Sequence, residues 1–281
     1  MISRQEIMDV SKNINLPVNI IEKDYVLGWV LAGIANHPEI GSNWIFKGGT
    51  CIKKCYINIY RFSDDLDFTV THPDLQKESF LIKTFKEITD WVYDNSGIEL
   101  PQELISFDTY ENLRSKISIQ GKISYRGPMK PGGDLPRIKL DLTNDEVITL
   151  DPVLSKIYHP YSDRNENNMQ VICKSYEELF AEKIRALGEC LRPRDLYDVT
   201  HLYRQYRVKN SSILILMILK QKCAFKSIEL PNIEILNSRP EIAELKVEWE
   251  NMLSHQVASL PPFNYFWQEL PEVFNWLYNP S

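Results

Sequence analysis

Hydrophobic and polar positions follow two different periods along the chain, and the change falls near residue 174. Before it, short stretches with the two-residue period of strands alternate with stretches of helical period. After it the helical period alone remains, with prolines between several of the segments. We therefore predict an α+β domain over residues 1–174, which opens with helices, and a helical domain over residues 175–281.

The predicted elements can be given by residue range. In the first domain, helices are expected over 3–36 (split near residue 16), 50–57 and 74–95. Strands are expected over 44–47, 65–70 and 137–143, with one or two more within 105–126. Residues 127–136 are predicted to be a loop, and 147–175 to be extended and irregular. In the second domain, helices are expected over 176–191, 195–206, 211–222, 239–256 and 263–278.

The strand over 65–70 alternates strictly and carries two carboxylates on one face. Asp65 and Asp67 point one way, and the apolar residues between them point the other way. Their spacing along a strand is roughly 6–7 Å. Carboxylates this close repel each other unless a cation lies between them, and oxygen ligands favour Mg²⁺ or Mn²⁺. The pattern therefore indicates a divalent metal site.

A third carboxylate, Asp141, lies on the polar face of the strand over 137–143. If that strand neighbours the first in one sheet, three carboxylates share a face, an arrangement that can hold two magnesium ions about 3.5–4 Å apart. The alternative is a solvent-facing aspartate that pairs with Lys139 or Arg137.

The sequence Gly48-Gly49-Thr50 lies between a predicted strand and a predicted helix. A glycine turn that opens a helix exposes backbone N–H groups and the positive end of the helix dipole, both of which suit phosphate. The Thr50 hydroxyl could add a donor. A plain tight turn is the alternative, but the two aspartates that follow favour a phosphate site.

A lysine lies on the apolar face of the helix over 176–191. On a helical wheel Lys183 falls between Cys190 and Leu187, so it requires an anionic partner, because burial of an unpaired ammonium costs several kcal/mol. A nucleoside triphosphate is one candidate; a structural ion pair, or a side chain that reaches to the rim, is the alternative. Asp195 either caps the next helix or pairs with Lys183, and Asp198 lies at the edge of that apolar side.

Composition and charge add one feature. The chain has 281 residues, of which 43% are hydrophobic, and a net charge of −6, so no overall basic field indicates nucleic acid. Between residues 111 and 140, however, seven basic side chains outnumber two acidic ones. A phosphate-facing groove and a solvated strand face are equally compatible with this cluster. The basic residues are Arg114, Lys116, Lys122, Arg126, Lys130, Arg137 and Lys139.

The five cysteines are odd in number and scattered, and the chain opens on a polar, capped helix rather than a signal peptide. We therefore expect free thiols in the reducing cytoplasm. Cys51 and Cys55 lie one helical turn apart, but no second pair of ligands follows, so no zinc site is expected. The apolar stretches are too short to cross a bilayer, and the histidines form no nucleophile–base arrangement.

Several of these segments together resemble the AbiEii-type nucleotidyltransferases, the toxin halves of abortive-infection toxin–antitoxin pairs. The resemblance covers about residues 18–205. It rests on IEKDYV at 21–26, KGGT at 47–50, RFSDDLD at 61–67, PRIKLD at 136–141, AEKIRAL at 181–187 and RDLYD at 194–198. The interval between Thr50 and Asp65 is long for the wider superfamily, although it suits this branch.

The resemblance implies a DNA polymerase β-like nucleotidyltransferase core with a mixed sheet, followed by a helical C-terminal region. It implies that Asp65, Asp67 and Asp141 bind metal and act in catalysis. It also implies a nucleotide-binding set of Gly48, Gly49, Thr50, Ser63 and Lys183, and that Asp195 and Asp198 complete the site.

The function expected from this resemblance is the Mg²⁺-dependent transfer of a nucleoside monophosphate from an NTP to an acceptor. RNA, with tRNA foremost, is the expected acceptor, Asp141 is a candidate base, and a cognate antitoxin is a possible partner. The alternatives are an NTP-binding regulator on a degenerate transferase scaffold, or transfer to a Ser, Thr or Tyr hydroxyl of a protein. A metal-dependent nuclease fits less well, because the glycine turn and Lys183 would then have no role.

Overall fold

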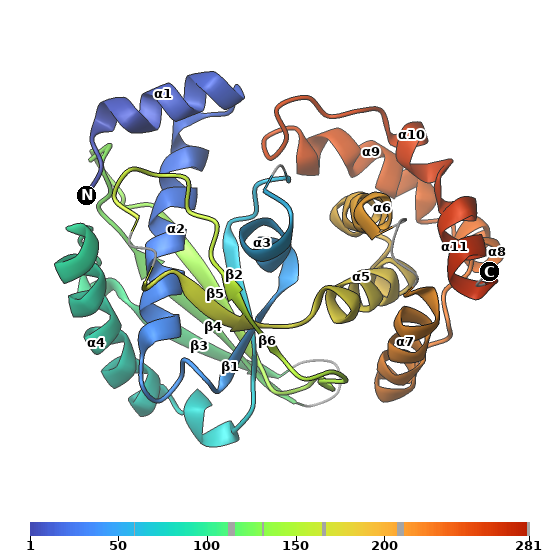
Figure 1. Cartoon of the computed structure of the whole chain (residues 1–281), viewed down its shortest axis with the longest axis horizontal. Helices are drawn as coiled ribbons and strands as arrows, with labels where there is room; N and C mark the ends of the chain where they lie inside the picture. The colour runs from blue at the N-terminus through green and yellow to red at the C-terminus, as the bar shows by residue number, and fades with distance from the viewer. Residues whose placement is uncertain (59, 112–115, 131, 165–166, 207–210, 280–281) are drawn as a thin grey trace. The chain divides into compact units, whose positions relative to one another are not determined.

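The computed structural model describes the chain apart from residues 59, 112–115, 131, 165–166, 207–210 and 280–281. Contacts divide it into two compact units. The first consists of Met1–Asp145 with Pro152–Lys174, and the second of Glu146–Asp151 with Ser175–Ser281. Figure 1 labels the elements of both.

The first unit is built on a mixed sheet, as expected for an α+β fold. In the described residues it has seven strands in the order β3-β4-β5-β2-β1-β7-β6. The β2–β5 and β1–β7 pairs are parallel, and the other neighbours are antiparallel. The strands are β1 (Trp44–Lys47), β2 (Asp65–Val70), β3 (Ser106–Glu111), β4 (Ile117–Ser124), β5 (Arg137–Thr143), β6 (Val153–Lys156) and β7 (Gln170–Cys173). The last two lie within the stretch expected to be irregular.

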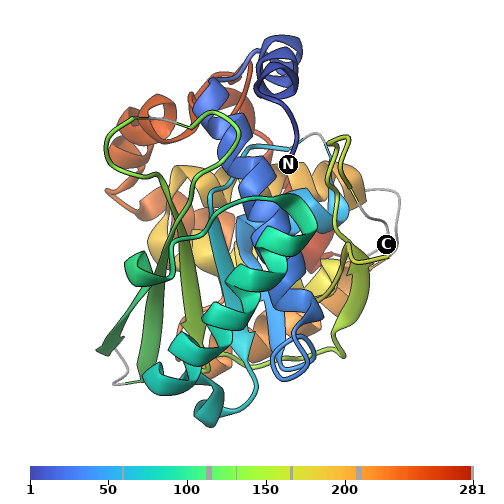
Figure 2. The same ribbon diagram turned by 90° about the vertical axis from the view of Figure 1, so that its left-hand side faces the viewer.

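The helices of this unit are α1 (Arg4–Ile14), α2 (Val18–Asn36), the short α3 (Gly48–Cys51) and α4 (Glu78–Ser96), with 3-10 turns at Pro73–Gln76 and Gln102–Leu104. Helices α2 and α4 lie side by side over one face of the sheet (Figure 2). Aromatic rings fill this interface: Trp44 lies 5.6 Å from Phe68 and 6.3 Å from Phe85 of α4, between ring centroids. Because side chains alternate along a strand, Asp65 and Asp67 project from the face opposite to Phe68.

The helix after β1 differs from the single helix expected over 50–57. It begins at Gly48, and from Ile52 to Tyr56 it widens into a π-helix. The widened turn brings two consecutive lysines to one buried carboxylate of α2: Asp24 lies 3.1 Å from Lys53 Nζ and 2.9 Å from Lys54 Nζ. Burial alone would raise the pKa of Asp24, but the two ammonium groups outweigh it and lower that pKa. This ion cluster fixes the helix beneath the glycine turn.

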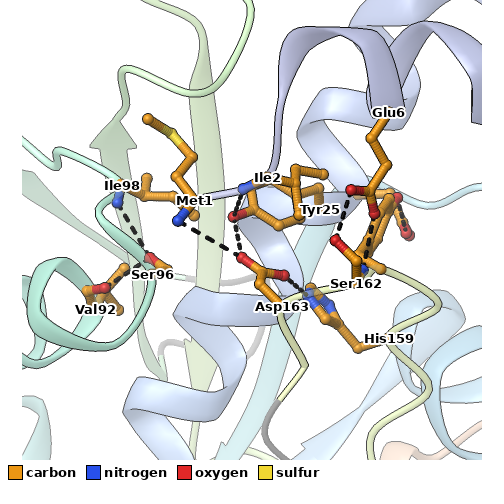
Figure 3. A network of polar contacts seen from close by, with 12 residues as sticks. Met1, Ile2, Glu6, Tyr25, Val92, Ser96, Ile98, His159, Ser162 and Asp163 are labelled. Carbon is orange, nitrogen blue, oxygen red and sulfur yellow. Dashed lines mark hydrogen bonds and ion pairs between the residues drawn. The ribbon is translucent and has the colours of Figure 1, made fainter.

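A second polar network ties α1 and α2 to the segment before β7 (Figure 3). The Tyr25 hydroxyl donates to Asp163 Oδ2 at 2.6 Å, and His159 Nε2 lies 3.7 Å from the other oxygen of Asp163. In α1 the Glu6 carboxylate accepts from the backbone and hydroxyl of Ser162, at 2.8 and 2.6 Å.

The second unit is helical in its described residues, in line with the helical region expected. Its helices are α5 (Tyr176–Cys190), α6 (Pro193–Tyr206), α7 (Ser212–Lys226), α8 (Ile233–Ser238), α9 (Ile242–Leu253), α10 (Phe263–Trp267) and α11 (Leu270–Tyr278). The short α8 was not expected. The helix expected over 263–278 is broken, because Pro271 in the first turn of α11 cannot continue an earlier helix.

A buried ion cluster explains why Glu146–Asp151 belongs to this unit. The Glu178 side chain was expected outside the apolar face, yet it is fully buried. It accepts hydrogen bonds from the backbone N–H groups of Thr149 and Leu150 and lies 2.7 Å from Lys222 Nζ. No helix in the described part of the chain is both long and apolar enough to cross a membrane.

Candidate active site

The polar face of the sheet carries a cross-strand row that contains two of the three carboxylates. Strands β2 and β5 are parallel neighbours, and Asp67 lies opposite Asp141. On β1, Lys47 lies opposite Asp67, and on β4, Gln120 lies opposite Asp141. Asp65 lies two residues before Asp67 on the same face, opposite Lys139. We call Asp65, Asp67 and Asp141 the acid row; the sheet brings all three to one surface.

Burial and neighbouring carboxylates dominate the electrostatics of two members of the acid row, Asp65 and Asp141. Burial, together with the neighbouring carboxylates of Asp64 and Asp67, raises the pKa of Asp65. Burial raises the pKa of Asp141 as well, despite a 3.4 Å hydrogen bond from the Gln120 amide, and the charge of Asp65 adds to the effect.

One oxygen of the acid row, Asp65 Oδ1, is buried without a hydrogen-bond partner. A buried acceptor of this kind is costly unless something occupies it. The potential metal ligands in the acid row are carboxylate oxygens, which Mg²⁺ and Mn²⁺ prefer. The chemistry of these residues therefore suits a hard divalent cation, and the three carboxylates would draw closer together than in this structure to share one ion.

The glycine turn packs directly against the acid row. Gly48 has a φ of +78°, which disfavours side chains, and a Cβ there would overlap Asp67 Oδ2. The Thr50 hydroxyl donates to the backbone oxygen of Asp65 at 2.6 Å. These two contacts fix the turn against the strand that carries the aspartates.

The second glycine of the turn faces two residues from the segment before β2. A Cβ on Gly49 would lie 2.5 Å from Arg61 Nη2 and 3.2 Å from Ser63 Oγ. Ser63 thus joins Gly48, Gly49 and Thr50 around the start of α3. Arg61, which is 2% exposed, places a guanidinium there that sequence reasoning did not assign to the site.

Lys183 of the second unit is held by two aspartates. Its Nζ lies 3.2 Å from Asp195 Oδ1 and 2.8 Å from Asp198 Oδ2. Asp195 therefore pairs with the lysine, in the first turn of α6 rather than as its cap. The Asp198 side chain is fully buried, whereas Lys183 keeps 15% exposure. Lys183 belongs to the second unit and the acid row to the first, so their meeting in one site stays a prediction.

The basic cluster over 111–140 is partly neutralised. Lys122 pairs with Asp108 at 2.6 Å, and Arg126 with Glu99 at 3.3 Å. Arg137 and Lys139 are exposed on β5. Lys116 and Lys130 are exposed as well, and Arg114 lies outside the described residues.

The sequence did not lead us to assign three residues to the site: Lys47, Gln120 and Arg61. For Lys47 and Gln120 a signal existed, because strand alternation places each on the polar face of its strand. Arg61 lies in a segment without periodicity, so nothing in its neighbourhood indicated burial beside a glycine.

Comparisons with known proteins agree with this fold. A family profile described as "Nucleotidyl transferase AbiEii toxin, Type IV TA system" matches residues 29–278. Among solved structures, the nucleotidyltransferase toxin MenT4 of Mycobacterium tuberculosis H37Rv is similar in fold, with a TM-score of 0.61 and 16% identity over 100% of this chain and 91% of that one. No curated protein matches the sequence. Because the profile spans most of the chain, the protein belongs to the AbiEii family of nucleotidyltransferase toxins of type IV toxin–antitoxin systems.

Proposed function

We propose that this toxin transfers a nucleoside monophosphate from an NTP to an RNA acceptor, with tRNA the first candidate. The observation that carries the proposal is the acid row, in which Asp67 and Asp141 stand opposite each other on parallel strands. The glycine turn beside it, where a Cβ at Gly48 would overlap the Asp67 carboxylate, supplies the second part of a nucleotidyl-transfer site.

Each residue of the site has a proposed role. Asp65, Asp67 and Asp141 would hold Mg²⁺ or Mn²⁺, which supplies charge neutralisation at the phosphates and favours ionisation of the acceptor hydroxyl. Asp141 is the candidate base for that hydroxyl, since it stands opposite Asp67 on the polar face of the sheet. The backbone N–H groups at Gly48 and Gly49 face the phosphates, and Thr50 and Ser63 fix the turn.

Lys183 is the proposed ligand of the nucleotide's phosphates. Asp195 and Asp198 fix its ammonium group while part of the side chain stays exposed. We infer that this lysine acts as a pre-positioned cation rather than as a freely moving one, which lowers the entropy cost of gripping the triphosphate.

The proposed acceptor is RNA because exposed basic residues lie on the same sheet as the acid row. Lys139 stands opposite Asp65, and Arg137 lies two residues before it on β5. Phosphate contacts from such residues position a nucleic-acid backbone without reading sequence. We place the reaction in the cytoplasm, where NTPs and tRNA are both available, and infer a cognate antitoxin as partner because the family belongs to type IV toxin–antitoxin systems.

The test uses the purified full-length protein with each α-labelled NTP, Mg²⁺ and either total RNA or total protein as acceptor. We expect label in RNA, lost in the Asp65→Ala/Asp67→Ala double variant. The control is Asp108→Ala, which changes an exposed carboxylate on the edge strand β3.

Three outcomes would contradict parts of the proposal. Label that survives the double variant would remove the acid row from catalysis. Label that resists ribonuclease and remains with protein would make a protein hydroxyl the acceptor. Tight NTP binding without any labelled product would make the chain a nucleotide-binding regulator.

A further inference from the structure

Three cysteines that have no role in the proposed nucleotidyl transfer meet in the first unit, and one of them, Cys51, directly follows Thr50. The sulfur atoms of Cys51, Cys55 and Cys173 all lie within 4.8 Å of one another, and none is in a disulfide. No other group of three potential metal ligands lies this close together among the described residues. Two are on consecutive turns after the glycines, whereas Cys173 ends β7.

The sheet topology explains why sequence reasoning did not find the third ligand. Strand β7 pairs in parallel with β1, and Cys173 lies opposite Phe46. The helix that carries Cys51 and Cys55 follows β1 directly. Cys51 and Cys173 are therefore distant along the chain, but the pairing of β1 with β7 brings them close together.

The spacing of the sulfurs suits a shared metal ion. Three sulfurs bound to one ion at about 2.3 Å lie roughly 3.8–4.0 Å apart, so the observed group needs little movement to close. No carboxylate or imidazole belongs to the group, and sets of thiolates alone select soft cations such as Zn²⁺ and Cu⁺ over Mg²⁺.

The cluster lies in the interior of the first unit. Cys51 and Cys173 are fully buried. The Tyr56 hydroxyl donates to the backbone oxygen of Lys174 at 2.7 Å, and its Oη lies 3.6 Å from Cys173 Sγ.

One member of the cluster, Cys55, lies at a cavity. Cys55 is half-buried and lines a cavity of about 280 Å³, together with Asn58, Tyr158 and His159. An ion bound to Cys55 would have room on the cavity side for the fourth, exogenous ligand that tetrahedral zinc requires when three protein ligands are present. Three basic residues, Lys54, Lys156 and Arg164, also line the cavity and would favour an anionic ligand there.

We propose that Cys51, Cys55 and Cys173 bind one thiophilic closed-shell cation, Zn²⁺ or Cu⁺, through their three sulfurs. Binding displaces the thiol protons to solvent and ties the helix after the glycine turn to β7. This site is separate from the acid row and does not depend on the proposed function.

The test uses the reduced full-length protein without oxygen. Co²⁺ serves as the optical probe for a zinc site, because thiolate ligands give it an intense charge-transfer band, and Cu⁺ is titrated against a coloured Cu⁺ chelator. We expect one equivalent of ion to bind per chain. If zinc is the ion, Co²⁺ should give a charge-transfer band that Zn²⁺ abolishes by displacing it. If copper is the ion, the protein should retain Cu⁺ against the chelator.

Single Cys→Ser variants separate the cluster from the rest of the chain. Cys51→Ser, Cys55→Ser and Cys173→Ser should each weaken binding by about 100-fold or more, because loss of a direct ligand costs at least as much as loss of an outer partner. Cys190→Ser and Cys223→Ser are the matched controls, since both thiols lie in the second unit, and they should bind as the unchanged chain does.

A second measurement needs no variant and remains decisive if the serine variants fail to fold. Alkylation of the unchanged chain, mapped by mass spectrometry, should show that one equivalent of the ion protects Cys55 but leaves the exposed Cys190 reactive. Failure of both cations to bind at one equivalent, equal binding by Cys173→Ser, or equal alkylation of Cys55 with and without the ion would each overturn the proposal.

Discussion

At the scale of single residues, Gly48 is subject to two constraints at once, one from its backbone conformation and one from a neighbouring carboxylate. Its φ of +78° disfavours a side chain, and the space where a Cβ would lie holds the Asp67 carboxylate. The sequence predicted a turn at this position from two glycines before a helix. It could not predict the carboxylate contact, because that contact depends on the antiparallel pairing of β1 with β2.

Gly48→Ala should reduce nucleotidyl transfer by about 100-fold or more, because the new methyl group displaces the Asp67 carboxylate, a proposed metal ligand, by an amount that active sites do not tolerate. Gly133→Ala is the matched control: its φ is +89°, but no atom lies near the position of its Cβ. Both variants carry about 1–2 kcal/mol of backbone strain. Equal activity of the two variants in a labelled-NTP assay would show that the contact with Asp67 does not matter.

Lys183 is the second residue whose environment makes a sharp prediction. Lys183→Met should lower the free energy of unfolding by about 3–5 kcal/mol, because the fully buried Asp198 would lose a partner at 2.8 Å. The exposed Lys220→Met on α7 is the control and should change stability by less than about 0.5 kcal/mol. Chemical denaturation measures both, and similar values for the two variants would contradict a buried ion cluster.

At the scale of elements, alternation was a reliable guide where a strand has one buried and one polar face. The period over 65–70 and 137–143 predicted both strands and assigned Asp65, Asp67 and Asp141 to polar faces. It could not show that the strands are parallel neighbours, since register depends on partners distant in sequence. For the same reason the sequence did not predict that Glu178 is buried, because its burial against Lys222 depends on the packing of α5 against α7.

The acid row should lower the stability of the metal-free protein at neutral pH. A carboxyl group whose pKa is raised on folding binds its proton more tightly in the folded state, so its contribution is most favourable below the ordinary value near 3.8 and is lost as pH rises through the raised pKa. Asp65→Asn removes this cost, and we expect a higher melting temperature than that of the unchanged chain at pH 7 without divalent ions.

Addition of Mg²⁺ should then reverse the order, since binding to the folded state stabilises the unchanged chain and not the variant. Asp108→Asn, on the same face but exposed, should respond to neither change. A lower melting temperature for Asp65→Asn in the metal-free state would contradict the electrostatic description of the acid row.

At the scale of the whole molecule, the family resemblance rested on short motifs that the fold distributes over two units. The glycine turn and the acid row lie in the sheet unit, and Lys183, Asp195 and Asp198 lie in the helical unit. The sequence motifs predicted nucleotidyl transfer, which the family profile supports. They contained no signal for the three-cysteine cluster, because one ligand comes from a strand that periodicity did not reveal.

If the acid row performs nucleotidyl transfer, the transfer rates of a small set of variants must differ sharply. The rate of label transfer from an α-labelled NTP should fall about 10³-fold in Asp67→Asn and in Asp141→Asn, since several kcal/mol of charge stabilisation are lost. It should change less than about threefold in Asp108→Asn, which lies farther along the same cross-strand row. Transfer that Asp67→Asn and Asp141→Asn leave intact would contradict the account.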